Sequence, residues 1–232
     1  PYIGPTQAAC EKMFHKYNAA QILQENGYKT LHSVLLSAQN SHDKTKQQIE
    51  AFFNEHTLTC AVVKPVAGGS SIGVFNVESS EKAAEKAAYL FDNNIDREAI
   101  LEPFCQGREF TVCVMANNDG EPVAFVPSEI EIDNTGGQIF DYRRKYLPTA
   151  NTKWYCPPRF SDEAVTTIRQ QAEEIFKLFG MRDFSRLDGW LLENEQRGGD
   201  ILFTDLNPIS GLEQNSFIFQ QAARLGLSHA DV

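Results

Sequence analysis

The chain has 232 residues, of which 42% are hydrophobic and 22% are charged, enough for one large domain or two small ones. Its formal net charge of −10 argues against nucleic acid or an anionic membrane as partner, because both favour basic surfaces. No segment is long and apolar enough for a membrane span, and no signal peptide is visible. The five cysteines show no CxxC spacing and are expected to stay reduced, so we expect a cytoplasmic protein.

Helices and strands alternate in the first half of the chain. Thr6 is a plausible N-cap for a helix that ends before Gly27. After a polar connector, we expect helices and strands at these residues: helix 43–54, strand 60–64, strand 72–77, helix 79–91 and strand 99–104.

The second half continues the alternation. The expected elements are strands at 109–116 and 122–132, a helix from Ser161 to Gly180, strands at 186–193 and 200–207, and a last helix at 215–225. The polar, glycine-ended segment 194–199 reads as a hairpin loop. No dinucleotide-binding fingerprint accompanies the pattern, which predicts an α+β fold with mixed or antiparallel sheets.

A glycine- and serine-rich loop follows a lysine at the end of a strand. Lys64 precedes the sequence Gly-Gly-Ser-Ser at 68–71, and another strand follows. Such a loop lets backbone N–H groups approach a phosphate closely. A loop of this composition alone is more often a flexible turn, and the lysine before it favours phosphate binding.

Two glutamates lie in apolar, strand-like surroundings. Glu102 sits on one predicted strand and Glu109 opens the next. A buried carboxylate needs a partner. Donors on adenine or ribose would supply one, and so would a structural lysine or arginine.

Carboxylates recur near the end of the chain, in Arg186-Leu-Asp188 and Asp205-Leu-Asn207. If the two predicted strands pair antiparallel, Asp188 and Asp205 can face one site. Carboxylate and amide oxygens are the hard ligands that hold Mg²⁺ against nucleotide phosphates. Two solvated acids at strand ends are the alternative for such a motif taken alone.

These motifs, in this order, resemble the D-alanine–D-alanine ligases of the ATP-grasp superfamily. The resemblance runs through essentially the whole chain. It rests on Lys64-Pro-x-x-Gly-Gly-Ser-Ser-Ile-Gly73, Glu102-x-x-x-x-Gly-Arg-Glu109, Phe140-Asp-Tyr142-x-x-Lys145-Tyr146, Cys156-Pro, Arg186-Leu-Asp188 and Asn207-x-x-x-Gly211. It implies an ATP-grasp fold, with two α+β subdomains that sandwich ATP.

The resemblance implies an ATP site built from several segments. The residues that would bind ATP are Lys16, Lys64, Gly69, Ser70, Ser71, Glu102, Pro103, Phe104, Cys105, Glu109 and Lys145. Among them the lysines and the 69–71 loop would contact the phosphates. Glu102 and the backbone of 103–105 would hold adenine, and Glu109 would take the ribose hydroxyls.

The same resemblance assigns metal, catalytic and substrate roles. Asp188, Asp205 and Asn207 would bind Mg²⁺ or Mn²⁺. The catalytic residues would be Arg186, Gly211, Ser70 and Tyr146, with Arg186 and the Gly211 N–H as the oxyanion site. Tyr142 and Ser216 would bind the amino-acid substrates.

The implied activity is an ATP- and Mg-dependent ligase that joins two amino acids through an acyl phosphate, in peptidoglycan precursor synthesis. Residues 1–103 would form the central subdomain and residues 104–232 the C-terminal one, without the family's N-terminal substrate domain. The chain starts at Pro1, which favours a processed form or an excised piece, and we expect this piece alone to bind nucleotide but form no dipeptide.

The resemblance also admits a homodimer of the intact protein. Residues 208–215 depart from the family's usual loop before Ser216, so a ligase of other amino-acid specificity is an alternative. A non-catalytic ATP-binding module is a second alternative, and an oxyanion arginine at 186 argues against it.

Overall fold

The computed structural model describes residues 2–132, 152–192 and 199–232, and these divide into two compact units. One unit contains Leu31–Cys105, and the other contains residues up to Thr30, Gln106–Glu131 and Lys153–Val232. The first thirty residues therefore pack with the second half of the chain, and the compact units differ from a single division of the sequence at residue 103.

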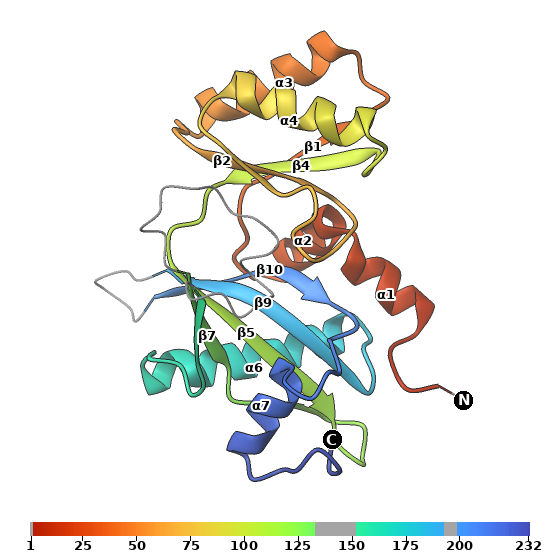
Figure 1. The fold of residues 1–232 in the computed structure, drawn as a ribbon, viewed down its shortest axis with the longest axis vertical. Coiled ribbons are helices and arrows are strands. Elements are labelled where there is room, and N and C mark those ends of the chain that lie inside the picture. Colours follow the sequence, from red (N-terminus) through yellow and green to blue (C-terminus); the bar gives the residue numbers. More distant parts are fainter. Residues whose placement is uncertain (1, 133–151, 193–198) are drawn as a thin grey trace. The chain divides into compact units, whose positions relative to one another are not determined.

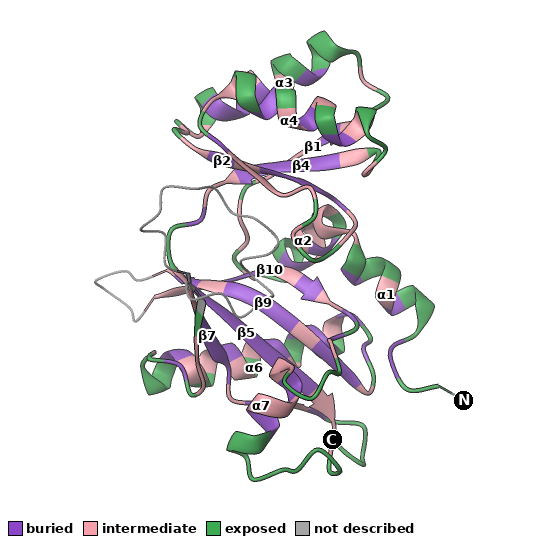
Figure 2. Cartoon of the chain, in the orientation of Figure 1, coloured by how far each residue is buried: buried purple, intermediate pink, exposed green. Residues whose placement is uncertain are grey.

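The unit of Leu31–Cys105 is a four-stranded antiparallel sheet with two helices against one face (Figure 1). Its strands are β1 (Val34–Ser37), β2 (Ala61–Pro65), β3 (Phe75–Val77) and β4 (Glu98–Pro103), in the order β1-β4-β2-β3. The helices α3 (His42–Glu55) and α4 (Ser80–Asp92) bury an apolar stripe against the sheet and expose their other sides (Figure 2).

The other unit is a six-stranded sheet with helices on both faces. Its strands are β5 (Arg108–Ala116), β6 (Pro122–Ala124), β7 (Ser128–Ile132), β8 (Thr152–Tyr155), β9 (Phe184–Leu192) and β10 (Asp200–Asn207). The order is β10-β9-β5-β7-β8, with β6 paired to β5. The helices are α1 (Gln7–Phe14), α2 (Lys16–Glu25), α6 (Asp162–Leu178) and α7 (Phe217–Arg224).

One face of this sheet carries the larger hydrophobic core. Phe110 and Leu187 project from the sheet into a cluster that contains Ile168 and Phe176 of α6 and Met13 of α1. The helix predicted from Ser161 to Gly180 is confirmed, and four of its buried residues, Ile168, Ala172, Ile175 and Phe176, lie in this cluster. Within the described helices, none is long and apolar enough to cross a membrane.

The α+β prediction is confirmed, with five differences in detail. The strand predicted at 72–77 begins only at Phe75, because the turn of the preceding loop extends to Gly73. The helix predicted over 6–26 breaks at His15, whose extended backbone (φ −84°, ψ 95°) ends α1 and caps α2. The strand predicted at 122–132 is two strands, β6 and β7. Strands β1 and β8 were not predicted, because each is only four residues long and lacks a strong apolar alternation.

Helix α7 is tied to the opposite face of the sheet by one buried amide. The Gln221 side chain accepts from the Cys113 N–H (2.9 Å) and donates to the Thr111 carbonyl (3.0 Å) and the Ser128 hydroxyl (3.1 Å). The Cys113 N–H and the Thr111 carbonyl are backbone groups of β5 between its pairings with β6 and β7, and Ser128 begins β7. The Gln221 amide therefore satisfies backbone hydrogen-bonding groups of β5 at the point where the neighbouring strand changes from β6 to β7. It also fixes the position of α7.

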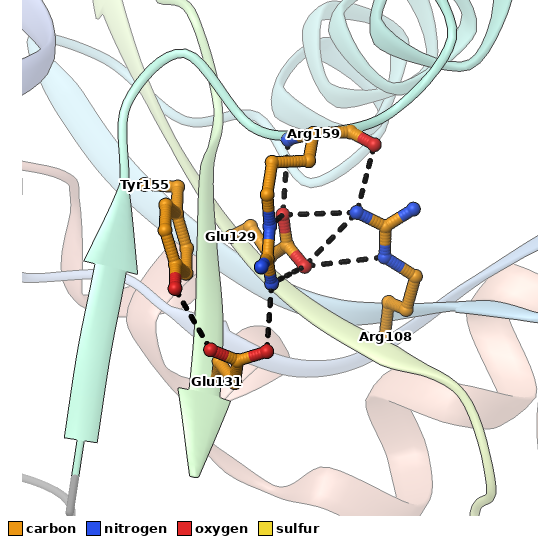
Figure 3. Close-up of polar contacts among 5 residues, drawn as sticks. All are labelled: Arg108, Glu129, Glu131, Tyr155 and Arg159. Atoms are coloured by element: carbon orange, nitrogen blue, oxygen red, sulfur yellow. Dashed lines mark hydrogen bonds and ion pairs between the residues drawn. The ribbon is translucent and has the colours of Figure 1, made fainter.

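A charge network joins β5, β7, β8 and the segment before α6 (Figure 3). Glu129 is almost fully buried and accepts hydrogen bonds from the guanidinium groups of Arg108 and Arg159, at 2.7–3.1 Å. Arg159 also reaches Glu131, which accepts from the Tyr155 hydroxyl at 2.8 Å. Burial raises the pKa of Glu129, but the hydrogen bonds from Arg159 and Arg108 together outweigh it and hold the pKa below its ordinary value.

Replacing Glu129 with Gln should lower the free energy of unfolding by about 2 kcal/mol at neutral pH, because two guanidinium groups lose their buried anion. The lowered pKa means that Glu129 stabilises the fold above its unfolded pKa and loses that effect as pH falls through the folded pKa. The deficit of Glu129→Gln should therefore shrink in acid, as measured by urea unfolding at a series of pH values.

Glu131→Gln is the matched control, because Glu131 contacts the same Arg159 from a side chain that is 43% exposed. It should change stability little. An equal loss in both variants, or a Glu129→Gln deficit that stays constant down to the lowest pH, would contradict the interpretation.

Candidate functional site

The paired strands β9 and β10 bring the predicted carboxylates together. They are antiparallel, and Asp188 lies directly opposite Asp205, with Arg186 opposite Asn207. Residues opposite each other in an antiparallel pair point to the same face of the sheet. All four side chains thus share one face, which we call the carboxylate face.

A bulge in β10 sets this arrangement. The register of the two strands shifts between Phe203 and Asp205, so Thr204 is the extra residue. Without a bulge, strict alternation would place Phe203 and Asp205 on the same side of the sheet. With it, Phe203 joins the hydrophobic core and Asp205 turns to the carboxylate face.

Asp188 is buried and held by four hydrogen bonds. Its Oδ1 accepts from the Thr111 hydroxyl (2.6 Å) and Arg186 Nε (3.0 Å). Its Oδ2 accepts from a terminal nitrogen of Arg186 (3.1 Å) and from Asn207 Nδ2 (3.0 Å). The arginine contact is bidentate, the strongest geometry for such a pair.

Asp205 is approached by Lys16, whose Nζ lies 3.6 Å from its Oδ1. Lys16 is the first residue of α2, and the His15 side chain caps that helix by accepting from the Asn18 N–H at 3.3 Å. The break between α1 and α2 therefore places the lysine beside the carboxylates. Each of the two carboxylates thus has a cation beside it.

These residues fit a hard divalent cation. Asp188 and Asp205 supply carboxylate oxygens from adjacent strands, and Asn207 can supply an amide oxygen. The ranges that the structure describes contain no group of three or more His, Cys, Asp or Glu side chains placed to hold a metal ion. An ion here would thus depend on the amide oxygen and on ligands from a substrate as well as on the two carboxylates.

In the other unit, Lys64 and Glu102 form a buried ion pair. Lys64 Nζ lies 2.7 Å from Glu102 Oε1, and both side chains are nearly inaccessible. The residues come from the adjacent strands β2 and β4. For a buried glutamate, the sequence left two kinds of partner open: donors on a nucleotide, or a structural lysine or arginine. In the structure Glu102 pairs with a lysine.

The loop after Lys64 contains two strained residues. Ser70 (φ 59°) and Ser71 (φ 55°) are both left-handed, and the Ile72 N–H donates to the Gly69 carbonyl at 3.2 Å. This is the geometry of a type I′ turn, which normally uses Asn or Gly. Each serine costs about 1 kcal/mol in this conformation, strain of a kind that concentrates at functional sites.

Ser216 stands at the N-terminus of α7, and its hydroxyl has no partner in the part of the chain that the structure describes. The residue is the N-cap but makes no side-chain cap hydrogen bond, and its Oγ is buried. The start of a helix favours an anion because its first N–H groups point outward. A hydroxyl and a helix start are thus both available here to a carboxylate.

The comparisons with known proteins identify a family for this chain. The family model described as "D-ala D-ala ligase C-terminus" matches residues 22–232. The chain belongs to this family. Its solved relatives have the ATP-grasp fold, so the predicted fold is confirmed.

Individual relatives span bacterial groups. A D-alanine–D-alanine ligase of Flavobacterium johnsoniae is 30% identical over 99% of this chain and 67% of its own length. One from Kineococcus radiotolerans is 30% identical over 73% of this chain and 44% of its own length. The crystal structure of the VanG D-Ala:D-Ser ligase from Enterococcus faecalis superposes with a TM-score of 0.81 at 27% identity, covering all of this chain and 62% of that one.

The residues assigned from the family fall on both units. Lys64, the 69–71 loop, Glu102 and 103–105 lie on one unit, and Lys16, Glu109, Gly211, Ser216 and the residues of the carboxylate face lie on the other. Phe104 donates its N–H to the Cys60 carbonyl at 3.4 Å, and Glu109 is buried. Tyr142, Lys145 and Tyr146 lie outside the described residues.

Sequence reasoning missed two residues of the site. Thr111 donates to Asp188, and Gln221 positions α7, whose first turn carries Ser216. Thr111 could have been found, because it alternates with Glu109 on a predicted strand and so shares its face. Gln221 had no comparable signal, because an isolated glutamine in a short helix is ordinarily exposed.

Two glycines of the loop should respond differently to alanine. Gly73 has φ +75°, and a Cβ there would lie 2.7 Å from Leu90, whereas Gly69 has open space around it and no positive φ. We expect Gly73→Ala to lower the free energy of unfolding by more than about 1 kcal/mol and Gly69→Ala to leave it nearly unchanged. Chemical denaturation of both variants measures this, and equal effects would contradict the geometry.

Proposed function

We propose that the protein containing this chain is an ATP- and Mg-dependent ligase that joins two amino acids, D-alanine or a close analogue, through an acyl phosphate. The chain spans 44% and 61% of the first two curated relatives it matches, so the whole reaction belongs to the complete protein. The single observation that carries the proposal is the register that sets Asp188, Asp205, Asn207 and Arg186 on one face.

The proposed chemistry begins with activation of a carboxylate. A carboxylate is a poor electrophile, and phosphorylation by ATP makes it open to attack by an amine. In-line phosphoryl transfer depends on cations placed around the phosphates. Lys16 and Lys64 supply two, and Mg²⁺ held by Asp188, Asp205 and Asn207 would neutralise charge on the transferred group.

The second step needs donors for an oxyanion. The amine attacks the acyl phosphate and gives a tetrahedral centre that carries a negative oxygen. Arg186 projects from the strand that carries Asp188, and the Gly211 N–H comes from the loop after β10. A guanidinium and a backbone N–H are suitable oxyanion donors. A pure nucleotide-binding module would have no use for this pair.

The second amino acid would bind through its carboxylate at the start of α7. The Ser216 hydroxyl and the outward N–H groups of that helix support this assignment. Because one similar structure is a D-Ala:D-Ser ligase, the second amino acid bound here is D-alanine or a close analogue such as D-serine. As a maker of peptidoglycan precursors, the enzyme would act in the cytoplasm on amino-acid substrates, as a monomer or a homodimer.

Lys64→Met should weaken ATP binding by at least about tenfold, because the phosphates lose a cation and Glu102 is left as an unpaired buried charge. Calorimetric titration of the chain with Mg-ATP measures this, and circular dichroism confirms that the variant is folded. Lys82→Met is the matched control, because Lys82 is an exposed lysine of the same unit. Unchanged affinity in a folded Lys64→Met protein would show that Lys64 does not bind ATP.

Arg186→Ala in the intact protein should lower kcat by at least about 100-fold while ATP affinity at saturating Mg²⁺ stays near that of the wild type, because an oxyanion donor acts in the transition state. Amino-acid-dependent ADP release, with dipeptide detected by mass spectrometry, provides the assay. A wild-type protein that binds ATP but forms no dipeptide with any amino-acid pair would favour the non-catalytic alternative.

A further inference from the structure

We propose that Arg186 and Lys16 act as internal counter-ions of the metal-binding carboxylates. A divalent cation must displace both side chains from the carboxylates, and each side chain can then contact an anionic group of the substrates. The inference rests on the proposed function, since it concerns the same face.

The first support is the saturation of Asp188. All four of its described hydrogen bonds come from Thr111, Arg186 and Asn207, and two of them come from one guanidinium. Both carboxylate oxygens are thus engaged by donors. A metal ion that binds Asp188 must take the place of at least one donor, and the two-point Arg186 contact is the one of opposite charge.

The second support is the orientation of Asn207. Its amide nitrogen points to Asp188 Oδ2 at 3.0 Å, so its amide oxygen points away from that carboxylate. To join Asp188 around one ion, the amide must rotate and present its oxygen. Asp188 and Asn207 are therefore held by contacts with each other, and Asp188 also by Arg186.

The third support is charge. Asp188 and Asp205 are matched by Arg186 and by Lys16, at 3.0 Å and 3.6 Å. A divalent ion that binds these carboxylates in place of the two cations frees a guanidinium and an ammonium. The freed Lys16 ammonium would contact the polyphosphate and the freed Arg186 guanidinium would contact the oxyanion, so metal and nucleotide should each tighten the binding of the other.

The proposal predicts an unusual result, because removing a positive residue of the active site should strengthen metal binding. Manganese binding to the nucleotide-free 232-residue chain can be followed by electron paramagnetic resonance of free Mn²⁺. We expect Arg186→Met to bind Mn²⁺ about tenfold more tightly than wild type, because its competitor for Asp188 is gone. Lys16→Met should show a smaller gain, since its contact is longer.

Three variants make the result specific. Arg224→Met removes an exposed arginine of α7 and should leave Mn²⁺ affinity unchanged, which controls for net charge. Arg186→Lys keeps the charge but loses the two-point contact, so its affinity should fall between wild type and Arg186→Met, and it serves if the methionine variant does not fold. Asp188→Asn should lose binding.

A spectroscopic signature provides the second readout. The Arg186 Nε–H donates to Asp188 Oδ1, so its nitrogen-15 resonance should shift on titration with Mg²⁺ and stay fixed in Asp188→Asn. Equal or weaker Mn²⁺ binding in both Arg186 variants, with Asp188-dependent binding in wild type, would overturn the counter-ion proposal alone. Wild-type binding that is unaffected by Asp188→Asn would overturn the metal site together with it.

Discussion

The close contact of two phenylalanine rings across a glycine is the constraint on which the carboxylate face depends. Gly189 pairs with Phe110 on one side and Phe203 on the other, and the two rings meet edge to face at 5.4 Å. A Cβ at Gly189 would lie 2.6 Å from Phe110 and 2.3 Å from the Leu202 carbonyl. Only glycine lets the three strands lie together with this packing. Because Gly189 follows Asp188 directly, the core on one side of the sheet fixes the position of Asp188 on the other.

The bulge at Thr204 is the second half of the same arrangement. Phe203 must face the core to meet Phe110, and Asp205 must face the opposite side to meet Asp188. Two residues of separation in a regular strand cannot satisfy both demands, and one extra residue can. Packing energy on the core side thus holds the geometry of the charged side, where the contacts themselves contribute less because burial of charge is costly.

The sequence predicted most of this fold, and the exceptions have physical reasons. Long amphipathic helices such as α6 and strands such as β5 carry periodic apolar patterns, and both were predicted within a residue or two. The break at His15 was missed because Ala9, Met13, Ala19 and Leu23 all pack into one core, so their spacing looks continuous. The pairing of Asp188 with Asp205 could be anticipated as antiparallel neighbours, but the bulge could not, since it depends on packing against residues of a distant strand. The partner of Glu102 was left open between a ligand and a lysine, and spacing alone could not select Lys64.

The carboxylate face and the 69–71 loop differ in how their local contacts affect the free energy of ligand binding. On the carboxylate face Asp188 is fully engaged and its charge is balanced, so the resting state there is stable and a ligand must compete with internal contacts. In the 69–71 loop the backbone is strained at two serines, which raises the free energy of this loop conformation. A change of the loop's conformation on ligand binding therefore costs little free energy. Binding at the first depends on exchange of partners, and binding at the second depends on release of strain.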